Sequence, residues 1–216
     1  MGSGRLLEFL FPPKCVLCGH LLERQEVDLC RKCRVETPEY QTGRKKLPNL
    51  DRWTAVWYYE GNVRVSLLRF KFRGARSYAA SYGRLLAMRL LREGMADFDL
   101  ITWVPVSRSR RWRRGYDQAA LIARAAAAEL ARTPVPLLKK TRSNPPQSGI
   151  TGAAARRANV LGIFRVTDPA AVAGKRILLL DDVITTGATA GECARVLLTA
   201  GAKSVNFAAV AGRRQD

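Results

Sequence analysis

The sequence has few acidic residues, a single histidine and no long apolar run. A transmembrane helix needs roughly 18 or more consecutive apolar residues, and no run in this chain approaches that length. Residues 1–15 contain Glu8 and lack a small-residue cleavage site, so we expect no signal peptide and a cytoplasmic protein. With His20 as the only histidine, we expect no Ser-His-Asp triad. Hydrophobic residues still make up 47% of the chain, which is enough for a folded core.

The excess of positive charge is the clearest feature of the composition. The chain has 37 lysines and arginines against 18 acids, for a net charge of +19. This charge indicates either a surface for polyanions, such as nucleic acid or a phosphate-rich ligand, or a solvated surface in an Ala- and Arg-biased composition. The total does not decide between these interpretations. Local clustering, as in RSRRWRRG at residues 108–115, is more informative.

Cysteine use sets the N-terminal part of the chain apart. Cys15 and Cys18 form one CxxC pair, and Cys30 and Cys33 form a second after eleven intervening residues. Each pair brings two thiolates together in a tight turn, so two pairs complete a tetrahedral site, and we predict a closed, structural zinc site. Disulfides are the alternative, and a reducing cytosol opposes them. His20 is expected to be a bystander, and Cys193 of the C-terminal part a small buried side chain.

Strand-like and helix-like segments alternate in the remainder of the chain. Apolar, β-branched segments predict strands at residues 52–59, 99–106, 162–166, 176–180 and 204–210. Helical patterns occupy residues 62–73, 77–93, 117–131 and 190–200, and residues 139–158 indicate a long loop. The alternation predicts an α/β fold with a mostly parallel sheet flanked by helices. We expect three parts: a zinc module at residues 1–40, a linker at 41–51 and the α/β domain at 52–216.

The stretch ILLLDDVITTGATA, residues 177–190, carries the strongest chemical signal. In an open α/β sheet, ligands bind beyond the carboxyl ends of the strands, and Asp181 and Asp182 follow the apolar core of one strand. Small, hydroxyl-bearing residues then lead into a helix, where backbone N–H groups and the helix N-terminus favour an anion. The carboxylates suit sugar hydroxyls or a hydrated Mg²⁺ ion. A ribose 5-phosphate with a metal-bound pyrophosphate satisfies the whole pattern; a helix cap beside two exposed acids is the structural alternative.

This stretch resembles the phosphoribosyl pyrophosphate (PRPP) signature of type I phosphoribosyltransferases. The competing phosphate cradle, GxxxxGK[ST], is absent from the sequence. The resemblance implies a type I phosphoribosyltransferase fold in which Asp181 and Asp182 bind the ribose hydroxyls of PRPP, with Mg²⁺ as cofactor. It also implies that the 5-phosphate is bound by the loop of Thr185, Thr186, Gly187, Ala188 and Thr189.

Three further segments narrow the family. The two CxxC pairs, RRGYDQA at residues 113–119, and Gln147 followed by RRANVLGIF at residues 156–164 together resemble the ComF family of competence and DNA-utilisation proteins. The resemblance covers nearly the whole chain. The chain departs from it at Tyr116-Asp117, where many members have Phe-Asn, and near Asn144, where many have Thr. Membership would imply a role in natural transformation or in the use of DNA as a nutrient.

Basic segments supply the other candidate residues. In phosphoribosyltransferases the loop after the strand equivalent to residues 99–106 contacts pyrophosphate, which implies such a role for Arg108 and Arg114; a solvated basic face that attracts nucleic acid is the compatible alternative. Trp112 would stack on a base or pack against the domain. Residues 139–158 stand where the family has a catalytic lid, which gives Gln147 and Arg157 candidate roles.

Two hypotheses for function remain open at this point. In the first, the protein is an enzyme that transfers the phosphoribosyl group of PRPP to an unidentified acceptor. In the second, it is a non-catalytic PRPP- or nucleotide-sensing module that binds single-stranded DNA through its basic surface. A competence helicase or a recombination protein is a candidate partner in either case, and a pure zinc interaction module is a third, weaker alternative.

Overall fold

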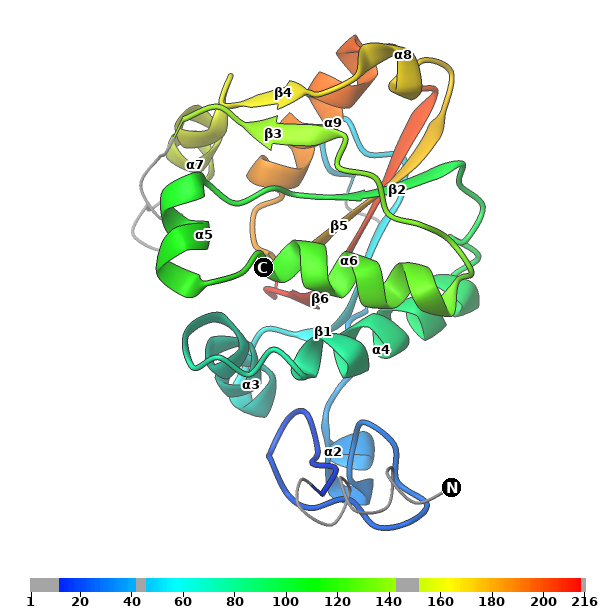
Figure 1. The fold of residues 1–216 in the computed structure, drawn as a ribbon, viewed down its shortest axis with the longest axis vertical. Coiled ribbons are helices and arrows are strands. Elements are labelled where there is room, and N and C mark those ends of the chain that lie inside the picture. The colour runs from blue at the N-terminus through cyan, green and yellow to red at the C-terminus, as the bar shows by residue number, and fades with distance from the viewer. Residues whose placement is uncertain (1–11, 42–45, 143–151, 215–216) are drawn as a thin grey trace.

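The computed structural model describes residues 12–41, 46–142 and 152–214. Its centre is a four-stranded sheet of β1 (Trp53–Tyr58), β2 (Leu100–Trp103), β5 (Arg176–Ile184) and β6 (Ser204–Gly212) (Figure 1). The strand order is β1-β6-β5-β2, and every pairing is parallel. This sheet confirms the predicted α/β fold. None of the helices in the described ranges is long and apolar enough to cross a membrane.

Helices cover both faces of the sheet because its central strands are apolar on both sides. Leu178 and Leu180 of β5 belong to a core cluster with α3 (Gly61–Phe72), α4 (Tyr78–Arg92) and α6 (Gln118–Glu129). Ile177 and Leu179 belong to a second cluster with α9 (Ala188–Thr199). Each fully buried leucine contributes about 1.5–3 kcal/mol relative to exposure. Cys193 lies fully buried in α9, as the sequence indicates.

Three segments differ from the sequence prediction. Residues 164–166 do not join the parallel sheet: β4 (Phe164–Val166) pairs antiparallel with β3 (Leu138–Lys140) in a separate two-stranded sheet. The expected loop at 139–158 begins in β3 and ends in α7 (Ala153–Val160), whose alanines and arginines are good helix formers. Residues expected to form a loop after β2 instead form α5 (Arg108–Arg114). The short α8 (Pro169–Val172) precedes β5.

The cysteine module packs directly against the α/β domain. It contains the short α2 (Arg31–Glu36) and lies at one end of the molecule, beside α3 and α4 (Figure 1). Val16 and Leu17 are almost fully buried in the same cluster as Leu67 of α3 and Leu86 of α4. The fully enclosed Asp28 carboxylate accepts two hydrogen bonds from Arg84, at 3.0 and 2.5 Å.

The segment between the module and β1 also contributes to the core. Tyr40, Leu47 and Leu50 are buried in the cluster that includes α9. Arg89 of α4 is itself buried and joins this segment to the sheet, because its guanidinium donates to the Tyr40 carbonyl at 2.6 Å and to Glu39 at 3.0 Å. The described part of the segment is therefore packed, while the division of the chain at residues 40 and 51 stays a prediction.

Candidate functional site

The acidic pair lies where the sheet becomes narrower. The last registered pair between β2 and β5 joins Trp103 to Leu180, whereas β5 continues beside β6 to Ile184. The strand is thus longer than the sequence predicts, and the two acids lie within it. Because β2 has already ended, Asp181 and Asp182 stand at an open edge beyond its carboxyl end. This is the position at which parallel α/β sheets bind ligands.

Asp181 is partly buried and lies beside the turn that follows β5. Its Oδ1 accepts a hydrogen bond from the backbone N–H of Asp182 at 2.8 Å. Burial raises the pKa of Asp181 well above its ordinary value, the negative charges of Asp182 and Asp117 raise it further, and Lys71 opposes them. A proton, a cation or a hydroxyl-bearing ligand would relieve this concentration of negative charge.

Asp182 is paired with a lysine from a distant part of the chain. The Nζ atom of Lys71, in the last turn of α3, lies 2.8 Å from Asp182 Oδ1. The two side chains are only 16% and 13% exposed, so this ion pair is more strongly shielded from water than a surface pair. Sequence analysis did not identify Lys71, because no local motif connects KFRG at residues 71–74 with the acids.

Asp117 is a third carboxylate near the pair. Its side chain caps α6, accepting from the backbone N–H of Ala120 at 3.1 Å and from that of Val106 at 3.4 Å. Burial raises the pKa of Asp117, and Asp182 raises it further. The residue that departs from the family pattern therefore has a local structural role that Asn would also fill, since both are good helix N-caps.

The residues expected to bind phosphate form the turn between β5 and α9 and the first residues of that helix. A small hollow is lined by Asp181, Phe207 and residues 183–190, which include Thr185, Thr186, Gly187, Ala188 and Thr189. Gly187 has a left-handed φ of 77°, and a Cβ atom there would lie 2.9 Å from Leu47 Cδ2. The turn therefore requires glycine on two grounds. It presents the N-terminus of a twelve-residue helix to the hollow, an arrangement that favours an anion.

The arginine-rich helix α5 contacts the rest of the domain at its C-terminal end and exposes other side chains to solvent. Ser107 caps α5 by accepting from the Arg110 backbone N–H at 3.4 Å. Arg114 donates to Gln118 at 2.8 Å and stacks over the Phe72 ring at 4.9 Å, whereas Arg108 is exposed. Trp112 is 89% exposed, so the expectation that it packs against the domain is wrong and stacking on an external partner is favoured.

Lys140 borders the same region from β3. Its Nζ lies 5.6 Å from the centroid of the Phe164 ring. Burial, and then the charge of Arg110, lower the pKa of Lys140 to about 8, while Cys193 and Asp181 act in the opposite direction. Of the two proposed lid residues, Gln147 lies outside the described residues and Arg157 is exposed on α7.

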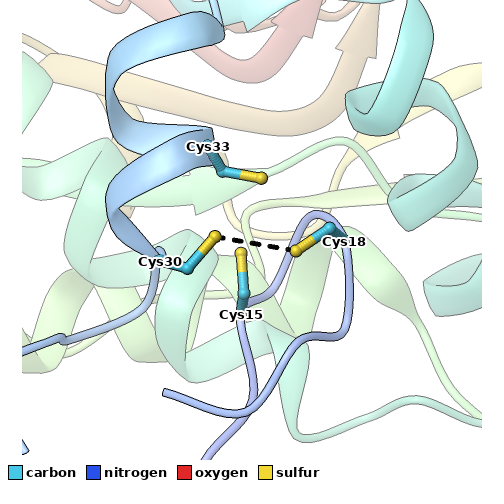
Figure 2. Close-up of side chains that lie close together, drawn as sticks. All are labelled: Cys15, Cys18, Cys30 and Cys33. Carbon is cyan, nitrogen blue, oxygen red and sulfur yellow. Dashed lines mark hydrogen bonds between the residues drawn. The ribbon is translucent and has the colours of Figure 1, made fainter. Parts of the chain in front are cut away.

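The four cysteines of the N-terminal module converge on one point (Figure 2). Their sulfur atoms lie within 4.8 Å of one another, and Cys18 Sγ lies 3.7 Å from Cys30 Sγ. A tetrahedral site with Zn–S bonds of about 2.3 Å would place its sulfurs roughly 3.8 Å apart, so the arrangement fits zinc. Burial acts to raise the pKa of Cys15, but backbone N–H groups of Cys18, Cys30 and Leu17 lower it to about 7, whereas burial raises the pKa of Cys18 and Cys33. The case for zinc therefore rests on the convergence of the four sulfurs. His20 is not part of the set.

Comparisons with known proteins agree with this two-part organisation. The model of the phosphoribosyl transferase domain family matches residues 117–216, and that of the double zinc ribbon domain matches residues 6–44. The DNA utilization protein YhgH of Salmonella typhi is 31% identical over 200 residues, covering 88% of this chain and 86% of that protein. Competence protein F of Haemophilus influenzae is 28% identical, covering 89% and 82%.

Part of the chain also resembles solved structures. The glutamine PRPP amidotransferase from B. subtilis is 21% identical and superposes with a TM-score of 0.45. The superposition covers 65% of this chain and 30% of that one.

Proposed function

The chain belongs to the ComF/YhgH family, with a phosphoribosyltransferase domain and an N-terminal double zinc ribbon, and on this premise we propose that it binds PRPP with Mg²⁺ and transfers the phosphoribosyl group to an acceptor. The observation that carries the proposal is the position of the acids. Asp181 and Asp182 stand beside the turn of residues 185–189, at the open end of the sheet. The two carboxylates need a partner with hydroxyl groups that donate hydrogen bonds, and the turn needs an anion. Ribose 5-phosphate supplies both.

The acids and the turn have complementary tasks in this proposal. Carboxylates accept hydrogen bonds from the 2- and 3-hydroxyls of the ribose and repel phosphate, so they orient the sugar. The turn binds the 5-phosphate through the N-terminus of α9 and through its hydroxyls. Mg²⁺ prefers carboxylate, phosphate and water oxygens, so Asp181 and Asp182 are the residues that would hold it, directly or through water, where it would neutralise the pyrophosphate.

The reaction itself is a substitution at the anomeric carbon of the ribose. The bond from C1 to the pyrophosphate oxygen breaks, a bond from C1 to the nucleophilic atom of the acceptor forms, and pyrophosphate leaves with the electron pair. Arg108, which is exposed on α5, is our candidate for neutralising the leaving group, and Gln147 and Arg157 are candidates for the lid. The cysteine module holds structural zinc and takes no part in this chemistry.

A second function is favoured by the exposed aromatic and basic surface around α5. Trp112 is 89% exposed within the arginine-rich α5, and Arg114 of this helix stacks over Phe72, which is 61% exposed. Aromatic side chains interleaved with arginines are typical of surfaces that bind single-stranded nucleic acid, where bases stack and phosphates pair with cations. Together with the names of the relatives, this surface supports a role in DNA uptake or utilisation in the cytoplasm, alongside a competence helicase or recombination protein.

Turnover distinguishes the enzyme from the non-catalytic sensor. The zinc-loaded protein is incubated with PRPP, Mg²⁺ and single acceptors (nucleobases, amines and single-stranded oligonucleotides), and pyrophosphate release is measured. An enzyme releases pyrophosphate only with its acceptor, and the Asp181→Asn variant does not. Binding of PRPP without release from any acceptor would favour the sensor, and salt-sensitive retention of single-stranded DNA under the same conditions would assign it the second function.

A further inference from the structure

Helix α3 connects the cysteine module to the acidic pair. Its buried face consists of Val63, Ser66, Leu67 and Phe70, and its last turn contains Lys71. The helix begins after β1, and Figure 1 shows it between the module and the open end of the sheet. One face of α3 thus contacts the zinc-binding part of the chain, while its C-terminal end contacts the candidate PRPP site.

On the module side, α3 is held by a buried polar contact within an apolar interface. The Ser66 hydroxyl donates to the Val16 carbonyl, one residue after Cys15, and lies 2.6 Å from the Tyr82 hydroxyl of α4. Val16 and Ser66 are almost completely buried. A hydrogen bond enclosed in this way is sensitive to position, because losing it leaves a buried carbonyl without its partner. The backbone that carries Cys15 and the middle of α3 are therefore fixed to each other.

On the site side, Lys71 pairs with one member of a group of carboxylates. Its ammonium group lies 2.8 Å from Asp182 Oδ1, and both side chains are shielded from water. Asp181 and Asp117 are the neighbouring acids. The cation offsets part of the repulsion within this group, and the ion pair restricts the rotamer of Asp182 before a ligand arrives.

We propose that Lys71 is a positioning residue for the acidic pair, and that docking of the cysteine module on α3 fixes Lys71 in place. This inference rests on the proposed function, because Mg²⁺-dependent binding of PRPP is its principal readout. It gives the zinc module a task in the ligand site, because the module sets the position of a cation through the helix that lies between them.

The first experiment measures the dissociation constant of PRPP with Mg²⁺ by calorimetry at pH 7.5. Wild type is compared with Lys71→Met, Lys71→Arg and, as a control, Arg73→Met, which removes an exposed cation at the same helix end. Lys71→Met is expected to weaken binding about tenfold at pH 7.5, Lys71→Arg to restore it within about threefold, and Arg73→Met to leave it unchanged.

Rescue by Lys71→Arg separates positioning from a general structural effect. Arginine keeps a cation at the end of α3 beside Asp182, whereas methionine keeps only the apolar length of the side chain. Thermal unfolding of both variants shows whether the fold is intact. If Lys71→Arg bound PRPP as weakly as Lys71→Met while both variants unfolded at the wild-type temperature, the proposal would be contradicted.

The second experiment tests the connection to the module with a double-mutant cycle. Ser66→Ala should weaken PRPP binding about threefold in wild type and leave it unchanged in Lys71→Met, while the zinc content stays the same. Tyr82→Phe, which removes the other partner of Ser66, replaces it if Ser66→Ala is insoluble. If Ser66→Ala weakened PRPP binding equally in wild type and in Lys71→Met, the proposed connection between the module and Lys71 would be overturned. Normal PRPP binding by Lys71→Met would overturn the role of Lys71. Failure of wild type to bind PRPP would instead overturn the proposed function, and this inference with it.

Discussion

The backbone N–H of Asp182 donates to the carboxylate of Asp181 at 2.8 Å, so one member of the acidic pair orients the other. The hydrogen bond favours the ionised form of Asp181, yet burial and the neighbouring charges outweigh it. The pair is therefore arranged for a ligand at the expense of the stability of the ligand-free fold. Functional sites commonly show this conflict between activity and stability.

The first prediction concerns pH and stability. Because the pKa of Asp181 is raised in the folded state, the folded state binds more protons than the unfolded state above pH about 4, and stability falls as pH rises. Asp181→Asn removes this effect. In urea denaturation without ligand, we expect the variant to exceed wild type by about 1–2 kcal/mol at pH 8 and by less at pH 5. A variant less stable than wild type at pH 8 would contradict the assignment.

The second prediction concerns the metal in the cysteine module. Cys33→Ser should abolish stoichiometric zinc binding and destabilise the whole chain, because the module and α3 share one core. Mass spectrometry of the metal content and thermal unfolding measure the two effects. Cys193→Ala is the matched control, since this buried thiol lies in α9, and it should retain zinc. Full zinc occupancy in Cys33→Ser would exclude the four-thiolate site.

The third prediction concerns the glycine of the phosphate-binding turn. Gly187→Ala should destabilise the protein by about 1–3 kcal/mol and weaken PRPP binding, because it adds backbone strain and a contact with Leu47. Gly174→Ala is a close control: its φ is 73°, nearly the same, but a Cβ atom there meets nothing within 4 Å. It should cost stability and leave the affinity for PRPP intact. Equal PRPP affinities in Gly187→Ala and Gly174→Ala would show that the turn does not contribute to PRPP binding.

The sequence predicts an element of the fold reliably where the residues of that element form an apolar segment or stripe. The strands of the parallel sheet show as short apolar segments because they are buried on both faces, as ILLL at residues 177–180 is. The RSRRWRR helix has no apolar stripe: the Ser107 cap and the left-handed Gly115 determine its ends. β3 contains two lysines and had no strand signal of its own, whereas the strand at residues 162–166 was predicted and its antiparallel pairing with β3 was not.

The candidate site was predictable in its motif and not in its surroundings. The acids and the turn are neighbours in sequence, and the four cysteines lie together near the N-terminus, so that local spacing alone indicates both binding sites. Lys71 approaches Asp182 only because α3 and β5 are neighbours in the folded chain, and Asp117 approaches the pair for a similar reason. A contact between segments so far apart in sequence follows from the tertiary structure, which residue spacing does not encode.

The fourth prediction concerns nucleic acid. Trp112→Ala should weaken binding of single-stranded DNA by about 1–3 kcal/mol, because a stacking side chain is lost, while thermal stability remains unchanged. Fluorescence anisotropy with a labelled oligonucleotide measures the affinity. Leu91→Ala removes an exposed apolar side chain in the last turn of α4 and should have no effect on DNA binding. Unaltered DNA affinity in Trp112→Ala would mean that α5 is not the binding surface.

The most direct test of the account is a calorimetric titration of PRPP with Mg²⁺ into the zinc-loaded wild type and the Asp181→Asn/Asp182→Asn variant. The account predicts saturable, Mg²⁺-dependent binding with one PRPP per chain in wild type and none in the variant, which keeps the size of both side chains. Absence of binding to folded wild type, or equal binding to both proteins, would contradict the assignment of a PRPP site to the acidic pair.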